Sequence, residues 1–137
     1  MVAGIDAFSN TLHVQFDILC LIVEPTHKSI DVFNRYSELA KISNIYENVF
    51  VVVNKIEDEA DLEFVQKNIP EEKIIGYIKK SKYLKELDMS GGALDIKKID
   101  EDTIHTLSRI EEKLLENTKD SSHRISKVKE VANKYKW

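Results

Sequence analysis

An apolar run near the start of the chain constrains the fold more than any other feature. Residues 14–24 are apolar on both faces of any strand they form, and Pro25 blocks the continuation of that strand. A strand of this kind needs helices on both sides, as in a parallel sheet. A second β-branched run, at about 48–54, ends on Asn54 and Lys55. These runs predict an α/β fold with a parallel sheet and helices on both faces.

Helical spacing alternates with these strands along the chain. A helix is predicted to follow Pro25, with Thr26 or Ser29 as its N-cap, and another to follow Asp58 or Asp61. Further elements are expected as a strand at 73–78, a short helix at about 82–88, a glycine turn at 91–92, and a helix from about 101 to 116. This alternation indicates right-handed crossovers between parallel strands. The buried face of the first helix is predicted to carry Ile30, Phe33, Ser37 and Ala40.

Composition sets limits on the class of protein. The 137 residues are 42% hydrophobic and 32% charged, which suits one core. No apolar run approaches the ~18 residues of a membrane span, and the first ten residues do not resemble a signal peptide. We therefore expect a cytoplasmic protein. The four histidines have no metal-ligand spacing, so no metal site is predicted, and the single Cys20 is expected to be a buried apolar residue.

The charge distribution divides the chain in two. Residues 1–118 carry 14 basic and 22 acidic side chains, whereas residues 119–137 carry six basic and two acidic ones. The acidic body argues against a nucleic-acid-binding surface. The basic tail has an apolar stripe at helical spacing, so it is predicted to dock on the acidic body. Membrane contact and disorder are the alternatives for this tail.

Asn54 and Lys55 are the sharpest candidates for a binding site. The carboxyl end of a strand is where open α/β sheets bind ligands, and an Asn amide can both donate to and accept from a purine edge. The structural alternative is a polar residue that caps the turn before Asp58. Glu57 stands where GTPases have an Asp that reads guanine, and it is one methylene longer. Adenine is therefore preferred to guanine as the base.

Several short runs, taken in order, resemble one family of nucleotide-binding proteins. They are Ala-Gly-Ile-Asp at 3–6, Val-Glu-Pro-Thr-His-Lys-Ser at 23–29, Val-Val-Asn-Lys at 52–55, Ile-Gly-Tyr-Ile at 75–78, and the run around Gly91 and Gly92 at 87–94. Together they resemble the C-terminal half of the MinD/ParA-like deviant-Walker P-loop ATPases. The nearest branch is the one that matures carbon monoxide dehydrogenase by nickel insertion, related to the nitrogenase iron protein.

The resemblance implies a role for each matching residue. Asn54 and Lys55 would bind the adenine of ATP, and Gly4 and Asp6 would belong to the switch segment. Glu24 and Lys28 would contact the nucleotide or a partner subunit. A complete member of the family would form an ATP-clamped dimer and act on a metallo-enzyme client.

The chain also departs from the family pattern. The Gly-rich phosphate loop with its lysines would lie upstream of Met1, and no other segment can hold the β- and γ-phosphates. We therefore expect an incomplete ATPase-like domain that does not hydrolyse ATP alone. It would act as a fragment, scaffold, or regulatory or complementing subunit of a metallo-enzyme maturation type ATPase. It would do so in a homo-oligomer or with an N-terminal half that pairs with its sheet edge. The alternative is a non-catalytic α/β protein-interaction module.

Overall fold

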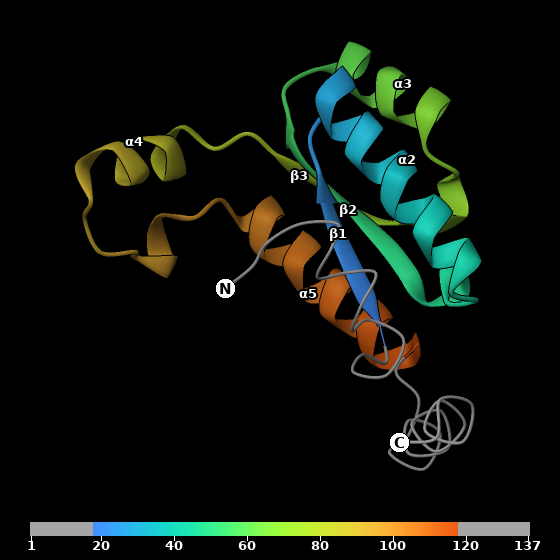
Figure 1. Cartoon of the computed structure of the whole chain (residues 1–137). Helices are drawn as coiled ribbons and strands as arrows, with labels where there is room; N and C mark the ends of the chain where they lie inside the picture. The colour runs from blue at the N-terminus through green and yellow to red at the C-terminus, as the bar shows by residue number, and fades with distance from the viewer. Residues whose placement is uncertain (1–17, 118–137) are drawn as a thin grey trace.

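The computed structural model describes residues 18–117 of the chain. Three parallel strands form one sheet in the order β1-β2-β3. Helices lie on both faces of this sheet, as Figure 1 shows, so the predicted fold class is confirmed. The strands are β1 (Leu19–Val23), β2 (Val49–Ile56) and β3 (Ile74–Lys79). The helices are α2 (His27–Ile42), α3 (Glu59–Asn68), α4 (Lys82–Ser90) and α5 (Glu101–Asn117), and the 3-10 turns are η1 (Tyr46–Asn48), η2 (Glu71–Lys73) and η3 (Ile96–Lys98).

The sheet face beneath α2 and α3 holds the larger core. Val51 and Val53 of β2 are fully buried there, and Val65 of α3 is fully buried against them. The predicted inner face of α2 is confirmed, because the four residues that it buries are Ile30, Phe33, Ser37 and Ala40. The cluster that contains Val51, Val53 and Val65 is the largest of the three buried apolar clusters among the described residues, and its burial stabilises this face of the sheet.

The opposite face is covered by α5 alone among the described helices. Its buried cluster consists of Val52, Ile75 and Ile110, with Cys20 half-buried beside it. Burial raises the pKa of the Cys20 thiol, which keeps it protonated near neutral pH. Ile22 of β1 is 62% exposed, so this face is thinly covered at the β1 side.

Two irregularities interrupt the pairing of β2 with β3. Val51 pairs with Ile74 and Val52 with Gly76, so β3 carries one extra residue, Ile75. A Cβ on Gly76 would lie 2.6 Å from the Ile110 side chain, which explains why a glycine stands where α5 packs closely on the strand. The second irregularity lies on β2 between Val53 and Ile56, and it contains Asn54 and Lys55.

The segment that carries α4 projects away from the sheet (Figure 1). Ser81 caps the start of α4 by accepting the Leu84 N–H, and Gly91 ends the helix in the left-handed conformation with φ of 70°. The predicted glycine turn is therefore a helix C-cap. Four large apolar side chains of this projecting segment are exposed: Leu84, Met89, Leu94 and Ile96.

The amino end of the sheet is closed by a buried lysine. Lys73 is 8% exposed, and its Nζ donates a hydrogen bond of 2.6 Å to the Tyr46 carbonyl oxygen. The same Nζ lies 4.0 Å from the centroid of the Tyr46 ring. Burial lowers the pKa of Lys73, and the nearby Glu72 and Glu47 carboxylates oppose that shift. These contacts join η1 to η2 across the start of β2 and β3.

No helix within residues 18–117 combines the length and apolar character needed to cross a membrane. The predicted boundary between residues 1–118 and 119–137 and the predicted tail helix fall outside the described residues, so both stay predictions.

Candidate functional site

The carboxyl ends of β1 and β2 bring two of the predicted site residues into contact. Glu24 directly follows β1, and Lys55 lies near the end of β2. The two strands are neighbours in register, and the Lys55 Nζ lies 2.7 Å from Glu24 Oε1. Their side chains are 55% and 42% exposed, so water screens this ion pair and it adds little to stability. A ligand can therefore displace it at low cost.

Asn54 precedes Lys55 in the β2 irregularity. Its Oδ1 accepts the Lys55 N–H at 2.9 Å, while Lys55 takes the left-handed conformation with φ of 61°. The amide therefore supports its own turn and does not cap α3. Among residues 18–117, the Asn54 Nδ2 group has no hydrogen-bond partner. One NH₂ donor group and one lone pair of Oδ1 thus remain for a ligand.

The helix that follows β1 is anchored to this edge by two side-chain hydrogen bonds. Thr26 Oγ1 accepts the Ser29 N–H at 3.2 Å, and Ser29 Oγ accepts the Glu24 N–H at 2.9 Å. Thr26 is therefore the N-cap of α2, and Ser29 ties the first turn of the helix to Glu24, two residues before the cap. This arrangement fixes the backbone of Glu24 next to Lys55.

The helix that follows β2 is anchored in the same way. Asp58 Oδ1 accepts the Asp61 N–H at 3.0 Å, and Asp61 Oδ2 accepts the Glu57 N–H at 2.8 Å. Asp58 is therefore the N-cap of α3, which decides between the two residues predicted for that role. The backbone on either side of the Asn54 turn is consequently held by side-chain hydrogen bonds.

A second ion pair at this edge was not predicted from the sequence. Lys80 follows β3, and its Nζ lies 2.8 Å from Glu57 Oε1. This hydrogen bond raises the pKa of Lys80. The two adjacent lysines after the third strand were the available signal, but their partner depends on the packing of β3 against β2. Lys79 pairs instead with Asp102 at the start of α5, at 3.5 Å.

The remaining predicted site residues do not join this cluster. Lys28 lies exposed in the first turn of α2 and forms no ion pair with residues 18–117. Gly4 and Asp6 fall outside the described residues, so their predicted switch role is untested.

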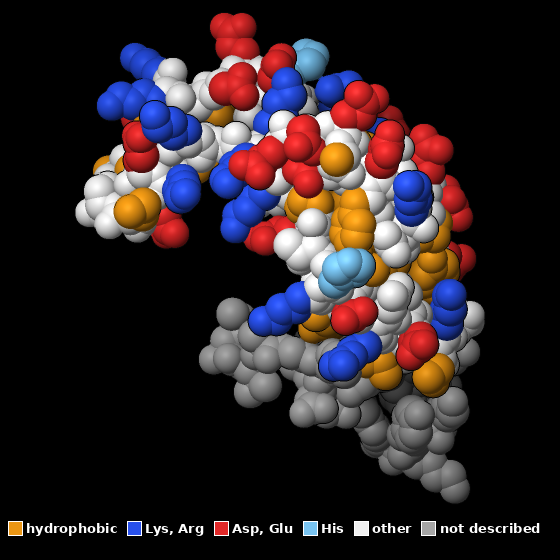
Figure 2. Space-filling view, turned by 90° about the horizontal axis from the view of Figure 1, so that it is seen from above, with side chains coloured by type: hydrophobic (Ala, Val, Ile, Leu, Met, Phe, Trp, Pro, Cys, Tyr) orange, Lys and Arg blue, Asp and Glu red, His pale blue; other side chains and the backbone are white. Residues whose placement is uncertain are grey.

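Figure 2 shows the molecule of Figure 1 from above. The segment that carries α4 stands apart from the rest of the molecule, and the surface is hollowed between them. Lys and Arg side chains gather along the walls of this hollow. The candidate site at the carboxyl end of the sheet is open to water as well, because the Lys55 and Glu24 side chains are both partly exposed.

The chain shows a distant similarity to an ATP-binding protein of an archaeon. It is 26% identical over 93 residues to a protein of Methanocaldococcus jannaschii described as an uncharacterized ATP-binding protein, MJ0084. The similarity covers 68% of this chain but 36% of that protein, so the chain spans about a third of the length of its relative. No protein-family model matches the chain. The resemblance to MinD/ParA-type ATPases and to the nickel-inserting branch stays a prediction.

Proposed function

We propose that this chain forms the base-binding half of an ATP-binding domain of the MinD/ParA type. The observation that carries the proposal is the Asn54 amide at the carboxyl end of β2, held by the Lys55 turn with its Nδ2 group unpartnered within residues 18–117. The distant similarity to an ATP-binding protein supports the same nucleotide. The amide would donate from Nδ2 to a ring nitrogen of adenine and accept from the exocyclic amino group at Oδ1.

The surrounding charges favour adenine over guanine. A guanine site needs a free carboxylate that accepts from the guanine ring N–H and amino group. Glu57 stands nearest to that role in the sequence, but its carboxylate is paired with Lys80 at 2.8 Å. A guanine would compete with Lys80 for that carboxylate, whereas an adenine that contacts Asn54 would not.

The phosphates of ATP would be bound by residues outside this chain. The sequence has four glycines, at 4, 76, 91 and 92, and none belongs to a Gly-rich loop followed by Lys and Ser or Thr. The proposed role is therefore a complementing, scaffold or regulatory part of an ATPase. A second copy or a phosphate-binding half would complete the site, and a metallo-enzyme is the proposed client.

Isothermal titration calorimetry with adenosine, ATP and guanosine tests this proposal. We expect adenosine and ATP to bind with affinities within about threefold, because only the base makes contacts, and guanosine about tenfold more weakly. Asn54→Ala should remove the preference for adenosine. Asn34→Ala is the matched control, because Asn34 is exposed on α2 away from the sheet edge.

Two results would count against the proposal in different ways. If Asn54→Ala bound adenosine as tightly as the wild type, Asn54 would not be part of a base-binding site. ATP that binds more than about tenfold tighter than adenosine would show phosphate contacts within this chain.

The alternative function is a protein-interaction module, and the projecting segment favours it. Met89 is 80% exposed and Ile96 is 67% exposed, which leaves apolar surface available to a partner. Partner binding that is insensitive to both nucleotide and Asn54→Ala would support this alternative.

A further inference from the structure

A groove separates the free side of β3 from α5, away from the candidate nucleotide site. Its volume is about 280 Å³, and β3 lines it with residues 74–77. Within residues 18–117, β3 pairs with β2 on one side and with no strand on the other. An unpaired strand edge offers backbone N–H and C=O groups that another strand can use.

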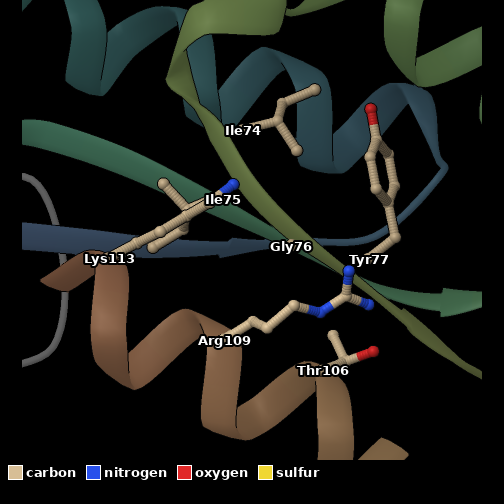
Figure 3. Close-up of a pocket in the computed structure, with 7 residues that line it drawn as sticks. All are labelled: Ile74, Ile75, Gly76, Tyr77, Thr106, Arg109 and Lys113. Carbon is tan, nitrogen blue, oxygen red and sulfur yellow. The ribbon is translucent and has the colours of Figure 1, made fainter. Parts of the chain in front are cut away.

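Two basic side chains of α5 reach into this groove. Arg109 and Lys113 lie one helical turn apart and both line it. Figure 3 shows Arg109 extending toward β3 near Gly76 and Tyr77, and Lys113 extending toward Ile75. Within the described part of the chain, neither side chain forms an ion pair. The groove therefore combines a free strand edge with two cations that lack a counter-charge there.

The β3 irregularity shapes the floor of this groove. Because Ile75 is the extra residue of β3, Ile75 and Gly76 both meet the α5 side, where Ile110 packs. Gly76 has no side chain, and the Ile110 side chain fills the space that a Cβ there would take. An incoming strand would therefore meet β3 along its unpaired side, where Arg109 and Lys113 line the groove.

We propose that this groove binds an extended acidic segment of a partner protein, which adds to the sheet as a strand beside β3. Main-chain hydrogen bonds to β3 would supply affinity, as in β-strand addition generally. Carboxylates of the segment would pair with Arg109 and Lys113, which selects acidic over basic sequences. The occupant is inferred from this charge complementarity.

A fluorescein-labelled peptide in which glutamate alternates with valine is the probe. We expect saturable binding by fluorescence anisotropy, weakened about tenfold in Arg109→Glu/Lys113→Glu. Lys67→Glu is the matched control, because Lys67 lies exposed on α3 at the opposite face, and it should change binding by less than about twofold. Hydrogen exchange should show protection of β3 amides when the peptide is bound.

A peptide with lysine in place of glutamate provides the reciprocal test. This lysine peptide should bind Arg109→Glu/Lys113→Glu more tightly than it binds the wild type. If the double variant does not fold, the single variant Lys113→Glu is used for the same comparison. The proposal is overturned if no acidic peptide binds, or if binding is unchanged in the charge-reversed variants. It is equally overturned if the protected amides lie outside β3, or if a single-stranded oligonucleotide competes fully for the groove.

Discussion

Two lysines show that the amino and carboxyl ends of the sheet differ in how well they are buried. Lys73, at the amino end, is 8% exposed and donates to the Tyr46 carbonyl oxygen at 2.6 Å. Lys55, at the carboxyl end, has a 55% exposed side chain and pairs with a Glu24 side chain that is also open to water. The amino end is sealed by buried contacts, whereas the carboxyl end keeps polar groups that can exchange partners. A ligand site is therefore expected at the carboxyl end.

The largest difference between the two edges should appear when each lysine is truncated. Lys73→Ala removes a short hydrogen bond, a cation–π contact and a buried aliphatic stem, so we expect a loss of about 2 kcal/mol in the free energy of unfolding. Lys55→Ala should cost no more than about 0.5 kcal/mol, because water screens its ion pair. Urea denaturation of both variants measures this. Equal losses would contradict the comparison.

The buried Lys73 should also make the free energy of unfolding depend on pH in a specific direction. Burial lowers the pKa of Lys73 in the folded state below its ordinary value of 10.5. Between those two pKa values the unfolded chain binds more protons than the folded chain, so stability attributable to Lys73 increases as the pH rises through this window. The difference in unfolding free energy between the wild type and Lys73→Met, measured across alkaline pH, should follow that direction. A difference that decreases with pH would show that Lys73 is not desolvated.

Removing a helix cap at the carboxyl end of the sheet should lower the free energy of unfolding by a smaller amount. The turns η1 and η2 at the amino edge have no side-chain cap, whereas α3 begins with the Asp58 cap beside the Asn54 turn. Asp58→Ala should lower the free energy of unfolding by about 1 kcal/mol, because it frees the Asp61 N–H. Glu59→Ala, one residue later and without a cap bond, is the control. If thermal unfolding gave the same loss of stability for both variants, the Asp58 cap would not stabilise α3.

The smallest effect concerns the backbone of the Asn54 turn. Lys55 has φ of 61°, which costs free energy for a residue with a Cβ. Lys55→Gly should therefore raise the free energy of unfolding by about 0.5 kcal/mol even though it removes the ion pair with Glu24. Lys55→Ala, which keeps the Cβ, should not. A destabilised glycine variant would show that the ion pair outweighs the strain.

The sequence predicts the elements of this fold well because their signals are local. The apolar runs of β1 and β2 and the inner face of α2 follow directly from burial and periodicity, as Ile30 and Phe33 illustrate. The predicted caps are also local, and the structure uses both Thr26 and Ser29 at the start of α2.

Features that depend on register or packing could not be predicted. The extra residue on β2 at Asn54 and Lys55 appears only when β2 is paired with β3. The contact between Glu24 and Lys55 needs the register of neighbouring strands. Arg109 and Lys113 show helical spacing in the sequence, but their direction depends on how α5 packs against β3.

Amide chemical-shift mapping by NMR during an adenosine titration tests the central claim most directly. We expect the signals of the Asn54 side-chain NH₂ and of the Lys55 and Glu57 backbone amides to shift with adenosine. We expect no response from amides near Lys73, and no shifts in Asn54→Ala. Shifts confined to the amino end of the sheet, or no saturable shift at Asn54, would contradict the assignment of the carboxyl edge as a base-binding site.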